Sequence, residues 1–445
     1  MVEDICAVAT PFGTGAISII RCSGPNTIEK VNKIFKGKDL TKVKSHTINY
    51  GYIIDNDEII DEVLCNVYLK PHSFDGENMI EINTHGGVFV TNKVLQTLLQ
   101  NGFRMAENGE FSKRAFLNNK LDLTQAEAIM DIISSTNDLA LNASFSSLRK
   151  STLNLVKNFR DKLLDIIAKI EVNIDYPEYE DSVEVTNNYL KPVVDNLLID
   201  IEKILENSKI STLVIHGINT AIVGKPNVGK SSLLNLLLEE DKAIVSDIAG
   251  TTRDIVEGRV IMKNITLNLL DTAGIHKSSG LEAIGVNKSI EAINKADLIL
   301  LVLDSSKELD DDDYKLLDLT KNKKRIIIAN KNDLKQKWDN NEAIFVSTFN
   351  PKTINVLQNK IIDLLNVNDF PNLNNQFLNN ERQINLLKKA YNSLLYAKEG
   401  INLNKSIELI EIDIKDAFDY LGEITGESNP EELITALFTK FCLGK

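Results

Sequence analysis

The sequence has few cysteines and few prolines, and each of these deficits excludes a class of protein. Of its 445 residues only 4 are cysteine and 9 are proline. The cysteines (Cys6, Cys22, Cys65 and Cys442) form no Cys-x-x-Cys pair and have no histidine nearby at metal-binding spacing, so the sequence predicts neither a zinc site nor a disulfide framework. With 43% hydrophobic and 25% charged residues, the chain has the composition of a folded protein rather than a disordered or fibrous one.

Long apolar runs and an excess of positive charge are also absent. No apolar run approaches the roughly 18–20 residues that a membrane span needs, and the start of the chain, Met1–Asp4, is acidic where a signal peptide would be basic. We therefore expect a cytoplasmic protein. The net charge of −13 repels phosphate backbones on average, so any RNA binding would need a local basic patch or a partner protein.

Changes in hydrophobic periodicity divide the chain into four segments. Residues 1–118 mix short β-rich runs with a helical stretch, which predicts an α+β domain. Residues 119–214 and 369–445 follow the helical period of 3.6. Residues 215–368 alternate apolar strands with helices, which indicates a doubly wound, mostly parallel sheet. The simplest arrangement is one helical domain built from both helical segments, with the α/β domain inserted between them.

Five apolar runs are expected as strands of the inserted domain, and one acidic run as the start of a helix. The strands are 220–223, 267–270, 298–303, 325–329 and 343–346. The four aspartates Asp310–Asp313 are predicted to be a solvated helix start rather than a metal site.

A phosphate-binding loop follows the first of these strands. The segment Gly224–Ser231 fits Gly-x-x-x-x-Gly-Lys-[Ser/Thr] and precedes a predicted helix, which is the context that the motif requires. Its glycines let backbone N–H groups close on phosphate, while Lys230 reaches the terminal phosphates and the Ser231 hydroxyl is a magnesium ligand. The alternative, a chance glycine-rich loop, becomes untenable once two further motifs are counted.

Those two motifs end later strands and identify the nucleotide. Asp271–Gly274 places a carboxylate near magnesium and a glycine N–H near the γ-phosphate. Asn330–Asp333 ends a further strand, and the Asp333 carboxylate can accept both N–H donors of the guanine edge, a pair that adenine lacks. The ligand predicted is therefore GTP rather than ATP.

The residue that positions the attacking water is not evident from these motifs. The Ras-like pattern has glutamine after the glycine of Asp-x-x-Gly, whereas Ile275 stands there and cannot form a hydrogen bond through its side chain. The segment 250–254 (Gly-Thr-Thr-Arg-Asp) contains two threonines, and Thr252 is the better candidate of the two for the second magnesium contact. Arg253 and Arg259 are interpreted as surface arginines, with an arginine-finger role as the alternative.

Blocks outside the nucleotide motifs resemble one family. They are 9–11 with 23–25, the block 108–118 (Asn-Gly-Glu-Phe-Ser-Lys-Arg-Ala-Phe-Leu-Asn), the block 120–128 (Lys-Leu-Asp-Leu-Thr-Gln-Ala-Glu-Ala), and the tail Phe441–Lys445. Together they closely resemble the MnmE (TrmE) family of tRNA modification GTPases, over the whole chain. The resemblance implies a multidomain α/β and α fold, with an N-terminal folate-binding domain, a two-part helical domain and an inserted Ras-like P-loop GTPase domain.

The resemblance also implies an activity and partners. A member of this family is a hydrolase acting on the acid anhydride of GTP, and it forms a homodimer through its N-terminal domains. It works with the FAD-dependent protein MnmG to add a carboxymethylaminomethyl-type group to C5 of the wobble uridine (position 34) of certain tRNAs. The carbon unit comes from 5-formyl- or methylene-tetrahydrofolate. The alternative is an Era-type ribosome-assembly GTPase switch, which would need a basic RNA-binding domain that this chain does not offer.

The residues expected at the GTP site follow from the motifs together with this resemblance. Glu282 matches the family's water-orienting glutamate and is assigned as catalytic with Lys230. Magnesium is assigned to Ser231 and Thr252, and potassium to Asn227, Ser246, Ile248 and Thr251; Asn227 tightening the turn is the alternative. The full set expected to contact GTP is Gly224, Asn227, Val228, Gly229, Lys230, Ser231, Ser232, Ser246, Asp247, Ile248, Ala249, Gly250, Thr251, Thr252, Asp271, Thr272, Ala273, Gly274, Asn330, Lys331 and Asp333.

For folate, the resemblance implies Arg21, Glu81, Lys120 and Lys445, with Cys442 lining the site in an open role. A basic pair suits the glutamyl carboxylate, and Glu81 can accept pterin N–H donors. The chain departs from the family in the loop 13–16 (Gly-Thr-Gly-Ala), where Gly-Arg-Gly-Gly is common. A second alternative therefore stays open, in which the N-terminal domain only dimerises.

Overall fold

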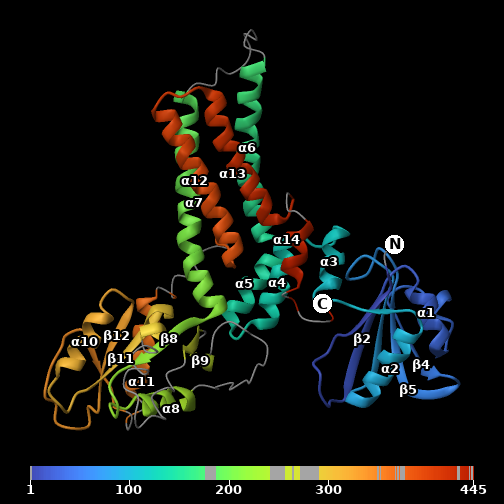
Figure 1. Cartoon of the computed structure of the whole chain (residues 1–445), viewed down its shortest axis with the longest axis horizontal. Coiled ribbons are helices and arrows are strands. Elements are labelled where there is room, and N and C mark those ends of the chain that lie inside the picture. The colour runs from blue at the N-terminus through green and yellow to red at the C-terminus, as the bar shows by residue number, and fades with distance from the viewer. Residues whose placement is uncertain are drawn as a thin grey trace. The chain divides into compact units, whose positions relative to one another are not determined.

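The structure is a computed structural model (Figure 1). It describes residues 3–175, 187–240, 256–262, 265–270, 290–347, 350, 352–365, 367, 370, 376–427, 431–439, 441 and 444. The chain divides into two compact units. The first comprises Met1–Met130 and Gly422–Lys445, and the second Asp131–Leu421. Among the described residues, no helix is both long and apolar enough to cross a membrane.

The first unit contains a seven-stranded sheet in the order β3-β4-β5-β6-β2-β1-β7. Neighbouring strands are antiparallel except for β1 and β7, which are parallel. Burial alternates along the long strand β5, as expected for a sheet with one covered face. The strands are β1 (Ile5–Val8), β2 (Ile17–Ser23), β3 (Phe35–Gly37), β4 (Thr47–Asp55), β5 (Glu58–Tyr68), β6 (Met79–His85) and β7 (Arg104–Met105).

Helices cover this sheet on both faces near β1. On one face α1 (Thr27–Ile34) and α2 (Val88–Gln100) enclose a core that contains the buried thiols of Cys6, Cys22 and Cys65. Ile5 and Ala7, which point to the other face of β1, pack with Phe111 of α3 (Glu110–Leu117). A short 3-10 helix, Leu40–Lys42, follows β3.

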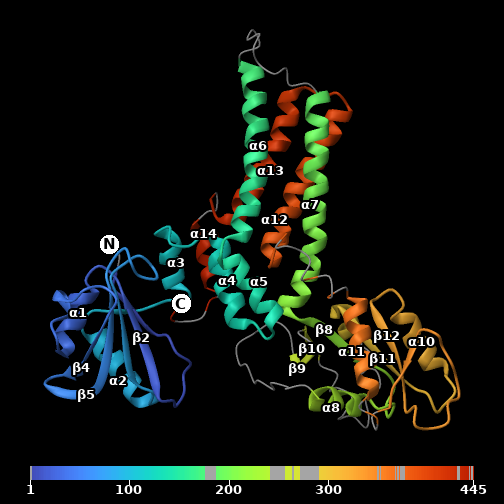
Figure 2. The same cartoon turned by 180° about the vertical axis from the view of Figure 1, so that it is seen from behind.

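The end of the chain returns to the first unit. Here α14 (Glu431–Phe438) lies beside α3, and its Phe438 packs with Leu123 at the start of α4 (Leu123–Ser134) (Figures 1 and 2). The rings of Phe438 and Phe441 are 4.9 Å apart. Gly444 lies so close to β1 that a Cβ there would be 2.5 Å from the carbonyl oxygen of Val8. The tail therefore belongs to the N-terminal sheet domain structurally.

The helical part of the second unit joins segments that are far apart in the sequence. Helices α6 (Ser151–Asp175) and α7 (Asn187–His216) lie alongside α12 (Glu381–Asn402) and α13 (Ile407–Thr425), as Figures 1 and 2 show from opposite sides. The guanidinium of Arg160 on α6 lies 4.2 Å from the ring centre of Phe418 on α13. Buried apolar residues recur three and four positions apart along α6, as the helical period requires: Val156, Phe159, Leu163, Ile166, Ile167 and Ile170. A shorter helix, α5 (Asp138–Leu148), contacts α6 and α7.

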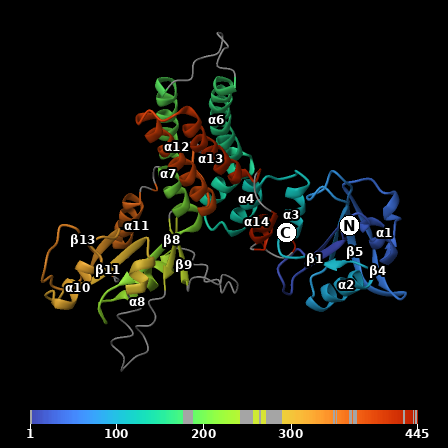
Figure 3. The ribbon, with the colours of Figure 1, turned by 45° about the horizontal axis from the view of Figure 1, so that its top comes forward.

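The inserted domain is a six-stranded sheet in the order β13-β12-β11-β8-β10-β9 (Figure 3). All pairs are parallel except β9 with β10. Both faces are buried, because alternate residues of β8 and β11 enter two different apolar cores. The elements are β8 (Ile218–Val223), α8 (Lys230–Glu240), β9 (Val256–Met262), β10 (Ile265–Leu270), β11 (Leu298–Asp304), α10 (Asp311–Leu319), β12 (Arg325–Asn330), β13 (Ala343–Phe345) and α11 (Lys352–Leu364).

The multidomain fold class and the five predicted strands of the inserted domain are confirmed. The acidic run does begin a helix: Asp310 is the N-cap of α10, and its side chain accepts hydrogen bonds from the N–H groups of Asp312 and Asp313. The expectation that the whole run is solvated is wrong for Asp313, which is only 4% exposed. The reason is an ion pair with Lys225, described below.

Candidate nucleotide site

The phosphate-binding loop is shaped by three residues with unusual backbone positions. A Cβ at Gly224 would lie 2.3 Å from the carbonyl oxygen of Val302 on β11, so the loop can leave the sheet at this point only with glycine. Asn227 has φ +65° and Gly229 has φ +101°. A Cβ at Gly229 would lie 2.1 Å from Nδ2 of Asn330. The loop therefore adopts a tight left-handed turn directly against the motif at the end of β12.

Lys230 is held in place at the first turn of α8. Its ammonium group donates to the carbonyl oxygens of Gly224 (2.8 Å) and Lys225 (2.7 Å). Burial lowers its pKa from the usual lysine value. Ser231 follows in the same turn, where a helix N-terminus favours anions. This arrangement brings a cation, a hydroxyl and the backbone N–H groups of a helix start to one point, and these are the groups that bind a polyphosphate.

The Asn330–Asp333 motif lies directly beside the loop. Nδ2 of Asn330 donates to the carbonyl oxygen of Val228 at 2.8 Å, which ties the two motifs together. Asp333 accepts a hydrogen bond from the Ser347 hydroxyl through Oδ1 at 2.6 Å, so a residue that follows β13 orients its carboxylate. The structure thus brings Gly224–Ser231 and Asn330–Asp333 together at the carboxyl edge of the parallel strands, where α/β sheets bind ligands.

Acidic residues at the end of β11 and at the start of α10 pair with a lysine from each motif. Lys331, at φ +65°, forms an ion pair of 2.6 Å with Asp304. Burial alone would raise the pKa of Asp304, but its hydrogen bonds with Lys331 and Ser306 outweigh burial and lower that pKa. Lys225 contacts Asp310 and Asp313. Lys225, Asp304, Asp310 and Asp313, together with Asn227 and Val228, are among the residues that line a cavity of about 250 Å³.

Several expected site residues lie outside the described residues. They are Glu282, Cys442, Lys445, Ser246 to Thr252, and Asp271 to Gly274. Ile275 and Arg253 lie outside the described residues as well. Within the described part, Ser232 follows Ser231 on α8. Sequence reasoning missed Asp304, Asp310, Asp313 and the loop lysine Lys225. The available signal was the position of Asp304 at the end of an apolar strand, one strand before Asn330.

Of the expected folate residues, the structure describes Arg21, Glu81 and Lys120. Arg21 forms an ion pair of 2.8 Å with Glu81, and both side chains are 17% exposed. The Arg21 guanidinium lies 5.2 Å from the ring centre of Phe74 and also donates to the carbonyl oxygen of Gly444 at 3.2 Å. Lys120 donates to the carbonyl oxygen of Pro71 in the same loop as Phe74. Sequence reasoning did not identify Phe74, an aromatic ring against the guanidinium.

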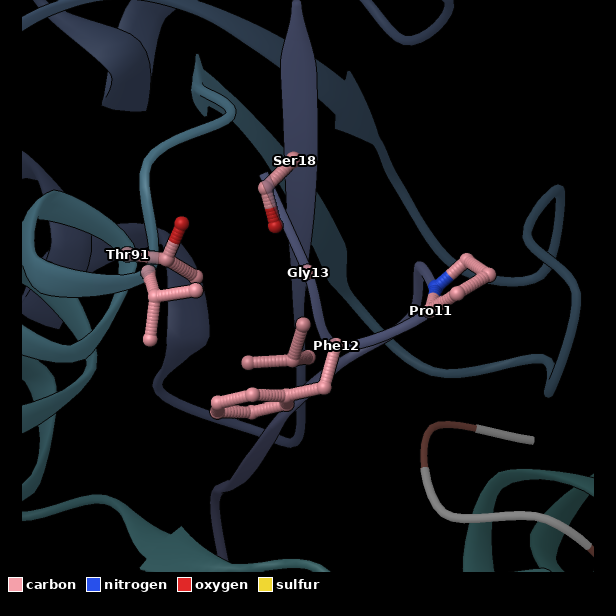
Figure 4. A pocket seen from close by; sticks show the side chains of 7 residues that line it. Pro11, Phe12, Gly13, Ser18 and Thr91 are labelled. Carbon is pink, nitrogen blue, oxygen red and sulfur yellow. The ribbon is translucent and has the colours of Figure 1, made fainter. Parts of the chain in front are cut away.

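Residues at the altered loop border a small space. Figure 4 shows Pro11, Phe12 and Gly13 near Ser18 on β2 and Thr91 on α2. The volume of this space is about 10 Å³, room for about one water molecule. The Phe12 side chain is 66% exposed. The space is therefore too small to hold a folate ring.

A phosphate-binding loop joined to an Asn-Lys-x-Asp motif, on a parallel sheet covered on both faces, defines a P-loop GTPase, an enzyme that hydrolyses GTP. Two family models match the chain: the MnmE helical domain over residues 123–442, and the GTP-binding protein TrmE N-terminus over residues 4–120. The chain belongs to the MnmE family of tRNA modification GTPases.

Relatives match along the full length. The tRNA modification GTPases MnmE of Streptococcus thermophilus and Acholeplasma laidlawii are each 47% identical to the chain, covering 100% of it and 98% and 99% of those proteins. A solved structure of Aquifex aeolicus Era is 29% identical over 33% of the chain and 56% of Era, with a TM-score of 0.24. The Era-type alternative is not favoured, because the family match includes both the N-terminal and the helical domains.

Proposed function

We propose that this protein couples GTP hydrolysis to the addition of a carboxymethylaminomethyl-type group to C5 of the wobble uridine of certain tRNAs. The observation that carries the proposal is the preorganised loop, in which the Lys230 ammonium is held by two carbonyl oxygens and Asn330 bonds the loop to the guanine motif. The full-length similarity to proteins named tRNA modification GTPases supports the tRNA substrate.

Hydrolysis on this account is direct attack of water on the γ-phosphate, without a covalent intermediate. Lys230 stabilises negative charge that develops on the transferred phosphoryl group, and its hydrogen bonds fix it before substrate binds. Asp333 selects guanine. Glu282 orients the water, a role that Ile275 cannot fill.

The donor set suits the two expected cations. The Ser231 hydroxyl at the start of α8 would hold magnesium together with Thr252, and the Asn227 side chain would hold potassium with oxygens of Ser246, Ile248 and Thr251. Asn227 already has the left-handed backbone that turns the loop at this point. Bound there, the cations supply positive charge to the phosphates in place of an arginine finger.

The carbon unit would come from a tetrahydrofolate derivative bound in the first unit. Arg21 and Lys120 would pair with the glutamyl carboxylate, with Lys445 contributing from the tail, and Glu81 would accept pterin N–H donors. The Arg21 guanidinium bonds both Glu81 on β6 and the carbonyl of Gly444, so it links the sheet to the tail and supports one shared site. Cys442 would line that site.

The working assembly would be a homodimer bound to the FAD-dependent protein MnmG in the cytoplasm. With a net charge of −13, this chain is poorly suited to hold tRNA alone, so tRNA would bind mainly through the complex.

The test is complementation in a bacterial strain that lacks its own member of this family. Nucleosides from total tRNA are separated by liquid chromatography and identified by mass spectrometry. Wild-type protein is expected to restore the modified wobble uridine, while Lys230→Ala and Glu282→Ala restore none at equal protein level. A modified nucleoside formed equally well by Lys230→Ala would disprove the coupling to GTP hydrolysis.

A further inference from the structure

Lys225 occupies a position of the phosphate-binding motif where the pattern allows any residue. Its side chain nevertheless forms ion pairs with two carboxylates at the start of α10, those of Asp310 and Asp313. Its ammonium lies 2.5 Å from Oδ2 of Asp310 and 2.7 Å from Oδ2 of Asp313, and the side chain is 27% exposed. The pattern Gly-x-x-x-x-Gly-Lys does not predict such an anchor, because the residue following the first glycine is not constrained by it.

The anchor is fixed to the start of α10. Asp310 and Asp313 form a capping box: Oδ1 of Asp310 accepts from the N–H of Asp313 at 3.2 Å, and Oδ2 of Asp313 accepts from the N–H of Asp310 at 3.2 Å. The Asp313 side chain is 5% exposed and the Asp310 side chain 60% exposed. The buried Asp313 carboxylate therefore has little freedom to move and is the firmer of the two contacts of Lys225.

The backbone of Lys225 connects this anchor to Lys230. The carbonyl oxygen of Lys225 accepts one of the two hydrogen bonds that hold the Lys230 ammonium, at 2.7 Å. The other acceptor is the carbonyl of its neighbour, Gly224, at 2.8 Å. Displacing Lys225 would therefore move an acceptor of the phosphate-binding lysine, and the left-handed turn at Asn227 starts two residues later.

We propose that Lys225 is a positioning residue: paired with Asp310 and Asp313 of α10, it fixes the backbone carbonyl that aims Lys230 at the nucleotide phosphates. The inference rests on the proposed binding and hydrolysis of GTP at this loop. Lys225 acts through Lys230 and touches no substrate atom itself. A pair that only stabilises the fold would leave phosphate binding unchanged.

The full-length protein and variants are compared by kcat and KM for GTP and by the dissociation rate of a fluorescent N-methylanthraniloyl-GDP, at 25 °C, with a thermal melt of each. The variants are Lys225→Met, Lys225→Arg, Asp313→Asn and the double variant Lys225→Met with Asp313→Asn. Lys315→Met is the matched control, because Lys315 pairs with Asp312 on the same helix at 2.9 Å, with both side chains about 70% exposed (71% and 69%).

The proposal predicts that Lys225→Met lowers kcat/KM and speeds GDP dissociation, each at least tenfold. Lys225→Arg stays within threefold of wild type and Lys315→Met within twofold. The double variant should be no worse than Lys225→Met, because the two side chains act as one unit. Wild-type kinetics in Lys225→Met, or fully additive effects in the double variant, would overturn it.

The readouts separate this inference from the proposed function. A wild-type protein that binds the GDP analogue but hydrolyses no GTP would refute hydrolysis, while the dissociation rates still decide the role of Lys225. A drop in melting temperature for Lys225→Met with unchanged kinetics would assign the pair to stability and overturn the positioning role.

Discussion

Gly229 lies so close to Asn330 that the substitution Gly229→Ala, which adds one methyl group, tests whether the nucleotide site needs this contact. In Gly229→Ala the new Cβ would lie 2.1 Å from Nδ2 of Asn330, a distance that no real structure tolerates. Either Asn330 gives up its 2.8 Å hydrogen bond to the carbonyl of Val228, or the loop shifts. The residue would also carry a side chain at φ +101°.

The magnitude follows from these two costs. A side chain in such a backbone region costs about 1–3 kcal/mol, and a lost hydrogen bond about 0.5–1.5 kcal/mol. Adopting the loop geometry that binds phosphate should therefore cost about 1.5–4.5 kcal/mol more than in wild type. If binding requires that geometry, GTP affinity falls about 10- to 1,600-fold, since each 1.4 kcal/mol is a factor of ten.

The assay is a fluorescence titration with a N-methylanthraniloyl guanine nucleotide. Gly258→Ala is the matched control in the same domain, because a Cβ there would lie 3.9 Å from Leu269, an ordinary contact. Its affinity should remain within twofold of wild type. An affinity of Gly229→Ala within threefold of wild type would refute the reasoning that the loop is preformed against Asn330.

Three further outcomes are expected. Asp333→Asn should weaken GTP binding at least 100-fold and improve binding of xanthosine triphosphate, measured by competition; unchanged preference for GTP would remove Asp333 from base recognition. Native protein should react with a thiol reagent at no more than one cysteine, Cys442, because burial raises the pKa of Cys6 and Cys65 to about 12 and that of Cys22 well above its usual value. Four thiols should react after denaturation, and two or more fast thiols in the native state would contradict this. Because the pKa of Asp304 is lowered below its usual 3.8, its pair with Lys331 contributes stability above that pH and loses it as the pH falls through the folded value. The unfolding free energy difference between wild type and Asp304→Asn should thus be constant from pH 8 to 5 and shrink below pH 4; a difference independent of pH would be the contrary result.

The sequence predicts those parts of the fold that depend on local pattern. Runs such as 298–303 are apolar on both faces, so they identify central strands, and all five predicted strands of the inserted domain are present. Strand β9 was missed because it is an antiparallel edge strand that mixes glycine and charged residues with apolar ones. Its place in the sheet depends on pairing with β10, the next strand along the chain. The sequence between these two strands has no distinctive turn motif.

Only the parts of the candidate site that depend on local sequence pattern could be predicted; the parts that depend on long-range contacts could not. The phosphate and guanine motifs are short and local, so the sequence identifies Lys230 and Asp333 directly. The burial of Asp313 and the engagement of Lys225 depend on contacts across 85 or more positions, which no local pattern encodes. The hydrogen bond from Arg21 to the carbonyl of Gly444 spans 423 positions and is likewise visible only in the fold.

The most direct test of the account is the release of phosphate from GTP and from ATP by the purified protein, with magnesium and potassium chloride present, beside Lys230→Ala at equal concentration. The account predicts that wild-type protein hydrolyses GTP and leaves ATP intact, and that Lys230→Ala hydrolyses neither. Hydrolysis of ATP at a rate similar to that of GTP, or unchanged GTP hydrolysis in Lys230→Ala, would contradict the assignment of this loop and its guanine motif as the GTPase centre.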